Sequence, residues 1–567
     1  MRTITGSANF VGSIGLTIVS SLFIGAVIAV LANGFVKGIN LLFDFHQTLL
    51  SDGGAGSDWF VQFCINSCVL GLALLVVTRL KSLLRGENWQ GPADIILASH
   101  NAHHAVGLKQ GFLASIASFL SLSSGASLGQ YGPIVHLGGL VGSWARQNRF
   151  APKWGADIWL GCGVAAAISA AFHAPIAGII FAHEAILRHF SARAAAPISI
   201  SAISASAFSA WLFGGDRILA MSAVPEDILP HLPILLLAGI MFALVAILIM
   251  KMNFWCIAHQ NRLSSLPRGT IVVVMLALLG TFLPEVLGLG LDTLKHIINQ
   301  DFVLMAVLLL FCFKFIAVLL SVYGGFVGGY FSPALYLGAA AGSLLNGLYS
   351  AIGIGLSGPL LIVSGMAAVS ACVIGAPVAV VVLVLELTMS YNFAVGAMIC
   401  VVTASFIAHL AYGHSLFDKQ LQNRNIDLSA GRVALSLSAQ NLSEIMHRDF
   451  AAAAPDCSVR QALDCLQSKQ KSELYLVDKE QKFIGKILGT KLDARASAPA
   501  NSFIDQDVLI FTPDLSLLVA IEKASNFVGE SIPVINSDGV LVGVVTEADL
   551  FASFLQTQKS ITAIEHG

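Results

Sequence analysis

Two matching stretches decide the fold of this chain: GASLGQYGPIVHLGGLVGS at 125–143 and GFVGGYFSPALYLGAAAGS at 325–343. At an offset of 200 positions they are identical at seven sites, which in the first stretch are Gly125, Gly129, Pro133, Leu137, Gly138, Gly142 and Ser143. A second pair follows in the same order, because HAPIAGIIFAHEA at 173–185 aligns with GAPVAVVVLVLEL at 375–387. Two matches in one order predict an internal repeat, with halves of about 10–215 and 230–415.

The sequence around these stretches is too apolar for a soluble protein. The 567 residues are 56% hydrophobic and only 11% charged, whereas soluble proteins average about 25% charged residues. Charged residues make up about 8% of positions 1–430 but about 21% of positions 431–567. We therefore predict a membrane domain over 1–430 and a soluble domain over 431–567. The net charge of −2 gives no attraction for nucleic acid.

Glycine and proline interrupt the apolar runs at corresponding places in the two halves. Irregular backbone at membrane depth is tolerated only where protein or a wet cavity satisfies its polar groups. Breaks in equivalent segments of a repeated protein indicate a binding site near the membrane midplane. We expect an all-α polytopic membrane domain, built from two repeated and inverted halves with many partly spanning helices.

The interrupted segments place helix N-termini beside the loops 129–133 and 329–333. Backbone N–H groups at a helix N-terminus, together with the helix dipole, favour an anion. A cation transporter would instead need acidic clusters in the membrane. The acids deep inside apolar runs are Glu184 and Glu386, at equivalent repeat positions, and these fit a structural role as well as a functional one.

The soluble region contains a weaker repeat of its own. LYLVDKEQKFIGKIL at 474–488 and IPVINSDGVLVGVV at 532–545 each contain two strand-like runs around a polar turn. Each follows a helical pattern, at 458–468 and 515–526. We predict a tandem α/β module.

The motifs together resemble those of the ClC family of chloride channels and chloride/proton antiporters. The segments that carry the resemblance are GQYGP, IVHLGG, FHAPIAGIIFAHE, GGYFSP, GAPVAVVVLVLELT and HSLFD. The soluble region resembles a pair of CBS domains. The resemblance implies a homodimer in the lipid bilayer, with one pathway for small anions in each subunit. It also implies residence in the plasma (cell inner) membrane and cytoplasmic termini.

The resemblance further implies which residues form the anion filter. Tyr131 occupies the position of the family's gating glutamate, and Ala185 that of the internal proton-carrying glutamate. Trp89 and Phe417 align with the serine and the tyrosine that usually bind the central anion. The expected anion-binding residues are Trp89, Gln90, Gly91, Gln130, Tyr131, Gly132, Tyr330, Phe331, Ser332 and Phe417.

The replacement of the family's two glutamates by Tyr131 and Ala185 favours passive anion conduction. A tyrosine, with a reference pKa of about 10, cannot exchange protons near neutral pH. One alternative is a chloride/proton antiporter with a rerouted proton path, and another is a carrier for a different small anion. Histidine titrates near neutral pH, so the candidate proton carriers are His100, His103, His104, His136, His173 and His183.

No cofactor is expected to be required, and chloride is the expected permeant ion. We find no metal-ligand spacing and no nucleophile–base set, so we do not expect an enzyme. Thr546 and Asp549 match the ribose-contacting positions of CBS pairs, so the module either binds an adenine nucleotide or only braces a dimer.

Overall fold

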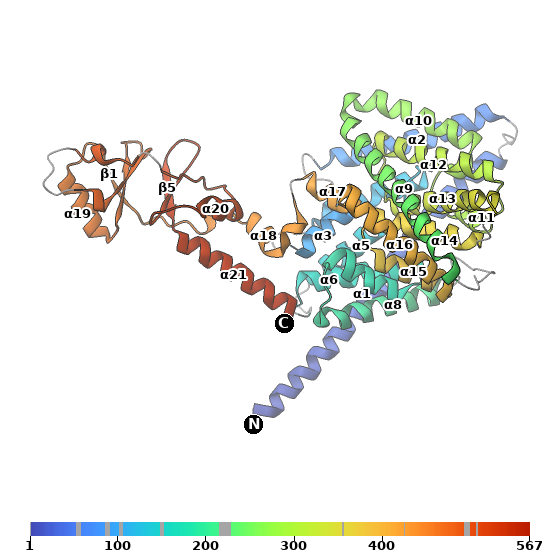
Figure 1. Ribbon diagram of the computed structural model, residues 1–567, viewed down its shortest axis with the longest axis horizontal. Helices are drawn as coiled ribbons and strands as arrows, with labels where there is room; N and C mark the ends of the chain where they lie inside the picture. The colour runs from blue at the N-terminus through green and yellow to red at the C-terminus, as the bar shows by residue number, and fades with distance from the viewer. Residues whose placement is uncertain are drawn as a thin grey trace. The chain divides into compact units, whose positions relative to one another are not determined.

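The computed structural model describes residues 2–52, 58–84, 91–100, 106–147, 152, 154–214, 228–353, 357–424, 426–492, 499–505 and 508–566. The chain divides into two compact units (Figure 1). The first contains Met1–Ser99 and His104–Asn425, and the second contains Ile426–Gly567 together with His100–His103. Each unit is described by itself below.

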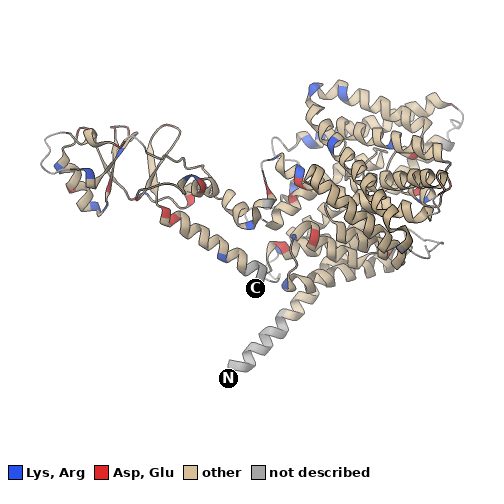
Figure 2. Cartoon of the chain, in the orientation of Figure 1, with Lys and Arg blue, Asp and Glu red and all other residues tan. Residues whose placement is uncertain are grey.

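The first unit is helical, and charged side chains are sparse on its helices (Figure 2). In its first half the helices are α1 (Arg2–Asp52), α2 (Trp59–Ser82), α3 (Pro92–His100), α4 (Leu108–Ser123), α5 (Tyr131–Arg146), α6 (Ala156–Phe172), α7 (Pro175–Phe181), the π-helix η1 (Ala182–Leu187) and α8 (Ala192–Phe213). In its second half they are α9 (Leu232–His259), α10 (Ser265–Phe282), α11 (Leu291–Ile298), α12 (Leu304–Gly324), α13 (Phe331–Ala351), α14 (Gly358–Ile374), α15 (Pro377–Thr388), α16 (Tyr391–Tyr412) and α17 (Leu416–Gln422).

Helix lengths confirm the expected mixture of full and partial spans. Within the described ranges, seven helices are long and apolar enough to cross a membrane. Other apolar helices, among them α6, α14 and α15, are shorter than the roughly 20 residues that a bilayer requires. The pairs α6–α7 and α14–α15 are each broken just before an Ala-Pro step, where His173 and Gly375 adopt left-handed backbone with φ of 54° and 80°.

Reciprocal contacts relate the two halves by a local two-fold axis. The backbone N–H of Ser127 donates to the Ser321 hydroxyl at 3.0 Å. The backbone N–H of Val327 donates to the Ser121 hydroxyl at 3.1 Å. At the offset of 200, Ser127 corresponds to Val327 and Ser121 corresponds to Ser321. Each half therefore donates to the other half the same hydrogen bond that it accepts from it. Such an exchange is what a two-fold relation between the halves produces, and the inverted orientation of the halves stays a prediction.

The two intramembrane glutamates take part in the same exchange. Glu184 accepts hydrogen bonds of 3.0 and 2.7 Å from the first turn of α15, and Glu386 accepts bonds of the same lengths from the first turn of α7. The donors are the backbone N–H groups of Val378, Ala379, Ile176 and Ala177. Each carboxylate therefore satisfies the N-terminal N–H groups of a helix in the other half.

Glycine lets consecutive helices pack backbone against backbone in both halves. A Cβ on Gly138 of α5 would lie 2.4 Å from the carbonyl oxygen of Gly163 on α6. At the equivalent place, a Cβ on Gly338 of α13 would lie 2.3 Å from the carbonyl oxygen of Gly365 on α14. The pairs α5–α6 and α13–α14 therefore form the tightly packed centre that carries the two glycine-rich loops.

The second unit is the predicted tandem α/β module. Its first repeat has strands β1 (Ala451–Ala453), β2 (Glu473–Val477) and β3 (Phe483–Leu488) in that order, with β1 parallel and β3 antiparallel to β2. Its second repeat pairs β4 (Ile532–Ile535) with β5 (Leu541–Val545) in antiparallel register. The helices are α18 (Gly431–Ser438), α19 (Val459–Lys469), α20 (Leu517–Ala524) and α21 (Glu547–His566).

A buried polar cluster joins the two repeats of this module. Lys486 and Glu473 form an ion pair of 2.6 Å, with both side chains nearly inaccessible to solvent. Glu473 also accepts from the backbone N–H and the hydroxyl of Ser531, at 2.9 and 2.7 Å. The Tyr475 hydroxyl lies 2.6 Å from the same Ser531 hydroxyl. Because every charge in this cluster is paired, the cluster holds the two repeats in one arrangement.

The reciprocal caps predict matched losses of stability. Replacing Glu386 with alanine removes two charge-assisted bonds and leaves two N–H groups without an acceptor, which costs about 2–3 kcal/mol. We expect Glu184→Ala and Glu386→Ala to lower the unfolding temperature of the detergent-purified protein by similar amounts, as measured by thermal unfolding. Glu285→Ala is the control, because Glu285 is exposed. A loss for either capping variant no larger than that of the control would contradict the capping role.

Candidate functional site

The two glycine-rich loops meet through a reciprocal pair of backbone hydrogen bonds. The N–H of Gly129 donates to the carbonyl of Gly329 at 2.7 Å, and the N–H of Gly329 donates to the carbonyl of Gly129 at 2.6 Å. A Cβ on Gly329 would lie 2.7 Å from the backbone nitrogen of Gly132, so no side chain fits there. The two loops therefore converge, and only glycine permits this close approach.

Helices α5 and α13 begin directly after this bridge, so their N-termini lie beside one another. The first N–H groups of a helix have no acceptor within the helix. Pro133 and Pro333 lie in the first turns of α5 and α13, where proline is tolerated because the N–H that it lacks would have had no partner in the helix. Two side-chain atoms, Ser332 Oγ and Gln130 Oε1, are buried here without a hydrogen-bond partner among the described residues. The site therefore presents backbone N–H groups and the hydroxyl of Ser332.

Three aromatic rings pack together at the same place. Tyr131 stacks on Phe172 with the ring centroids 4.0 Å apart and the planes 18° apart. Phe331 meets the Tyr131 ring edge-on at 5.4 Å and the Phe172 ring edge-on at 5.6 Å. Tyr131 and Phe331 are repeat equivalents at the first positions of α5 and α13. The aromatic cluster thus stands at both helix N-termini.

A polar cavity of about 610 Å³, here named the vestibule, opens beside the loops. Among the described residues, its wall carries two basic side chains, Lys81 and Arg424, and one acidic side chain, Asp94. The other polar residues that line it are Ser115, Ser118, His136, Gln260, Gln420 and Asn423. The excess of positive charge suits a compartment that gathers anions.

A second cavity, of about 40 Å³ and almost wholly apolar, adjoins the vestibule. Four residues line both cavities and are here named the neck: Pro92, Gly132, Tyr330 and Phe417. Tyr131, Phe172 and Phe331 line the apolar cavity beyond the neck. Tyr131 and Phe172 also line a further apolar cavity of about 20 Å³. The cavities therefore narrow from the vestibule, through the neck, to the aromatic cluster.

Most of the residues expected to form the filter come together here. Gly91 lines the vestibule, and Gly132, Tyr330 and Phe417 belong to the neck. Trp89 and Gln90 lie outside the described residues. Nothing in the sequence singles out Phe172, although it directly precedes the His-Ala-Pro motif. Asp94 and Arg424 were also missed, because nothing in the sequence places them at one cavity.

The candidate proton carriers have separate environments. Ala185 is buried, and the carboxylate of its neighbour Glu184 is engaged with α15. His183 Nδ1 lies 3.1 Å from the carbonyl oxygen of His189. His136 lines the vestibule, and neither of its ring nitrogens meets hydrogen-bond geometry with a described residue. His103 and His104 lie outside the described residues.

In the second unit, Thr546 and Asp549 form one local structure at the start of α21. The Thr546 hydroxyl donates to Asp549 Oδ2 at 2.6 Å, and the Thr546 N–H donates to the same oxygen at 3.0 Å. His447 Nε2 lies 3.0 Å from Asp549 Oδ1. Partial burial opposes ionisation, but the hydrogen bonds from Thr546 and His447 outweigh it and hold the pKa of Asp549 below its usual value.

The family model for the voltage gated chloride channel matches residues 71–409, more than half of the chain, and the CBS domain model matches 442–488 and 500–555. The chain belongs to the voltage-gated chloride channel family. Members of this family are channels and transporters, and this chain is an integral membrane protein with a CBS pair. A similar curated relative is the voltage-gated ClC-type chloride channel ClcB of Escherichia coli (strain SMS-3-5 / SECEC). It is 29% identical over 314 residues, which are 53% of this chain and 73% of the relative.

Solved ClC structures share the fold. A slow cyanobacterial Cl⁻/H⁺ antiporter has a TM-score of 0.64 and 20% identity, covering 72% of this chain and 98% of that one. A CLC-type fluoride/proton antiporter has a TM-score of 0.58 and 22% identity, and the match covers 71% of this chain and 97% of that one. A eukaryotic CLC transporter has a TM-score of 0.61 and 17% identity, and the match covers 94% of this chain and 98% of that one. At these identities the likeness establishes the fold.

Proposed function

We propose that this protein is a chloride channel, which conducts anions passively through one pathway in each subunit. The membrane domain over 1–430 provides the pathway, and the CBS pair over 431–567 regulates or braces it. The observation that carries the proposal is the aromatic cluster, in which Tyr131 stands where a proton-exchanging carboxylate would be needed for coupling. The curated relatives described as chloride channels support the choice of anion.

Tyr131 acts as the gate in this proposal. Its ring lies between the apolar cavities and is held by Phe172 and Phe331, so it obstructs the pathway sterically. A carboxylate can leave such a position by taking a proton, whereas a phenol with a reference pKa of about 10 stays neutral near pH 7. Movement of the ring therefore opens the pathway without moving a proton.

The glutamates that remain in the membrane support passive conduction as well. Glu184 and Glu386 each accept two backbone hydrogen bonds, so neither carboxylate is free to carry protons along the pathway. The position expected for the internal proton acceptor is occupied by the buried Ala185. The family's usual carboxylate route for protons therefore has no carrier at the gate position, which Tyr131 occupies, or at the internal position, which Ala185 occupies.

The anion is held by the N–H groups at the starts of α5 and α13, with the Ser332 hydroxyl as an additional donor. The filter is completed by Trp89, Gln90, Gly91, Gln130, Tyr131, Gly132, Tyr330, Phe331 and Phe417. Neutral dipoles bind an anion without trapping it, which conduction requires. We also propose that the protein is a homodimer of the plasma (cell inner) membrane with cytoplasmic termini, as in the family that it resembles.

A second candidate function is chloride/proton antiport by another route, or transport of a different small anion. His136 favours the antiport alternative, because it lines the vestibule one helical turn from Gly132 and histidine titrates near neutral pH. Anion movement with uphill proton movement would support this alternative.

Simultaneous measurement of chloride and proton movement separates the two functions. We expect purified protein in liposomes to pass chloride down a gradient, with the potential clamped by valinomycin, while the external pH stays constant. Empty liposomes give the background. Uphill proton movement driven by chloride would overturn the channel proposal.

Removal of the gate ring is expected to raise chloride flux several-fold. Tyr131→Ala opens the space between the two apolar cavities while the loops keep their glycine bridge. The rate of chloride efflux from liposomes, normalised to incorporated protein, provides the measurement. Tyr391→Ala is the control, since Tyr391 is exposed at the start of α16. Equal flux in Tyr131→Ala and wild type would remove Tyr131 from the gate.

We further propose that the CBS pair binds an adenine nucleotide through Thr546 and Asp549. Because the pKa of Asp549 is lowered, its carboxylate stays charged at and above the usual value of about 3.9 and accepts ribose hydroxyls throughout the neutral range. Calorimetry on the full chain with ATP should therefore give similar affinity at pH 7.5 and 6. Asp549→Ala should weaken binding about tenfold or more. Asp538→Ala, in an exposed turn, is the control. Absence of ATP binding by the wild type would leave the CBS pair as a brace.

A further inference from the structure

The neck is built by elements that are far apart in the sequence. Pro92 begins α3, and Phe417 lies in the first turn of α17. Ile186, on η1, lines the apolar cavity that the neck opens into. The width of the pathway at this point depends on how α3, η1 and α17 are held relative to one another.

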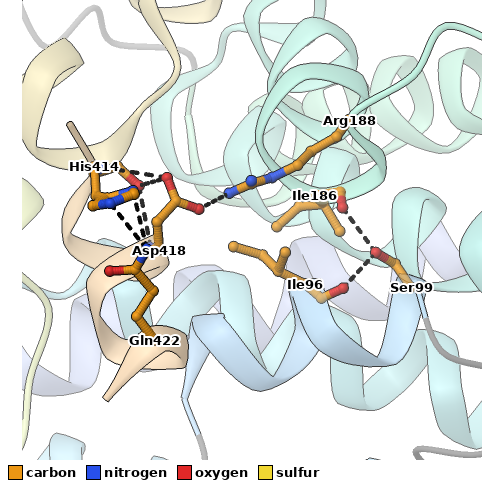
Figure 3. Close-up of polar contacts among 8 residues, drawn as sticks. Ile96, Ser99, Ile186, Arg188, His414, Asp418 and Gln422 are labelled. Atoms are coloured by element: carbon orange, nitrogen blue, oxygen red, sulfur yellow. Dashed lines mark hydrogen bonds and ion pairs between the residues drawn. The ribbon is translucent and has the colours of Figure 1, made fainter. Parts of the chain in front are cut away.

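The first contact joins α3 to η1. The Ser99 hydroxyl lies 2.8 Å from the carbonyl oxygens of Ile96 and Ile186, so it shares its proton between its own helix and η1 (Figure 3). Ser99 is buried. The contact fixes the end of α3 against a residue that lines the apolar cavity.

The second contact joins the residue after η1 to α17. The guanidinium of Arg188 donates to Asp418 Oδ1, and Figure 3 shows the Arg188 side chain extended toward that carboxylate. The other oxygen, Asp418 Oδ2, accepts from the Ser415 hydroxyl at 2.8 Å and from the Ser415 N–H at 3.2 Å, in a capping box. One carboxylate therefore caps α17 and ties its first turn to η1. Phe417 is the residue immediately before it.

The third contact joins the end of α17 back to α3. Arg424 donates to Asp94 Oδ1 at 2.7 Å. Asp94 Oδ2 accepts from the backbone N–H of Gly91 at 2.8 Å, so the same carboxylate holds the start of α3 beside Pro92. The Asp94 side chain is almost fully buried, which strengthens its ion pair relative to one in water.

These contacts close a ring, here named the belt, of Ser99–Ile186, Arg188–Asp418 and Arg424–Asp94. We propose that the belt sets the width of the neck, and that Arg188 is a positioning residue which acts through Phe417 to determine the size of anion that passes. The inference rests on the proposed anion pathway and adds a specificity determinant outside the filter. Arg188 does not line either cavity and so acts only by holding α17.

A belt of this kind acts on large anions more than on small ones. When the ion pair is lost, the first turn of α17 keeps its capping box but is no longer fixed to η1. Phe417 then moves more freely, and the neck admits anions that it normally excludes. Both side chains of the Arg188–Asp418 pair are partly exposed to solvent, and such ion pairs contribute little, so the effect on selectivity is modest.

The test measures the flux of methanesulfonate relative to chloride in liposomes. We expect Arg188→Gln to raise this ratio about two- to fivefold. Arg188→Lys should keep the ratio near that of wild type, because a single charged donor reaches Asp418 Oδ1. Arg193→Gln is the matched control, since Arg193 is exposed in the first turn of α8. Arg424→Gln should act in the same direction and serves if Arg188→Gln does not fold.

A double-mutant cycle separates positioning from general loosening. In a Phe417→Ala background, Arg188→Gln should have no further effect, because the side chain through which it acts is absent. An additive effect, or a ratio for Arg188→Gln equal to that of Arg193→Gln, would overturn the role of Arg188. If Phe417→Ala itself leaves the ratio unchanged, the neck lies off the pathway and the inference falls. If the wild type passes no anion at all, the proposed function falls with it.

Discussion

The close approach of two backbones at Gly129 and Gly329 is the constraint on which the membrane unit depends. Two hydrogen bonds of 2.7 and 2.6 Å hold the loops together, and a Cβ on Gly329 would clash with Gly132. Because the loops are joined there, the N-termini of α5 and α13 must lie side by side. The reciprocal caps of Glu184 and Glu386 and the glycine contacts between helices repeat the same two-fold relation outward from this point.

The proposed pathway combines two environments that act differently on an anion. Among the described residues, the vestibule wall carries Lys81, Arg424 and Asp94, and in the proposed function this net positive charge attracts anions from a distance. Beyond the neck the walls are almost wholly apolar, and the hydrogen-bond donors at this place include the backbone N–H groups at the starts of α5 and α13 and the hydroxyl of Ser332. An anion that leaves water there must be stabilised by fixed dipoles, so the positions of the helix ends matter more than the charges of side chains.

Sequence reasoning identified the loops because their requirements are local. A glycine at a close approach and a proline in a first helical turn leave visible marks, and the repeat displays them twice. Tyr131 and Ala185 could be singled out because they occupy defined positions within such motifs. Phe172 could not, since nothing local distinguishes a ring that packs on Tyr131 from one that faces lipid.

By itself, the sequence determined that the chain has a membrane part and an α/β module, that the membrane part is repeated, and that its loops suit an anion. These properties follow from composition and from backbone chemistry within short segments. Only the tertiary structure decided that Glu184 and Glu386 cap helices across the repeat, and that Arg188 and Arg424 pair with acids 230 and 330 positions away. Contacts over such separations leave no periodicity or spacing in one sequence, because the folded chain alone brings their partners together.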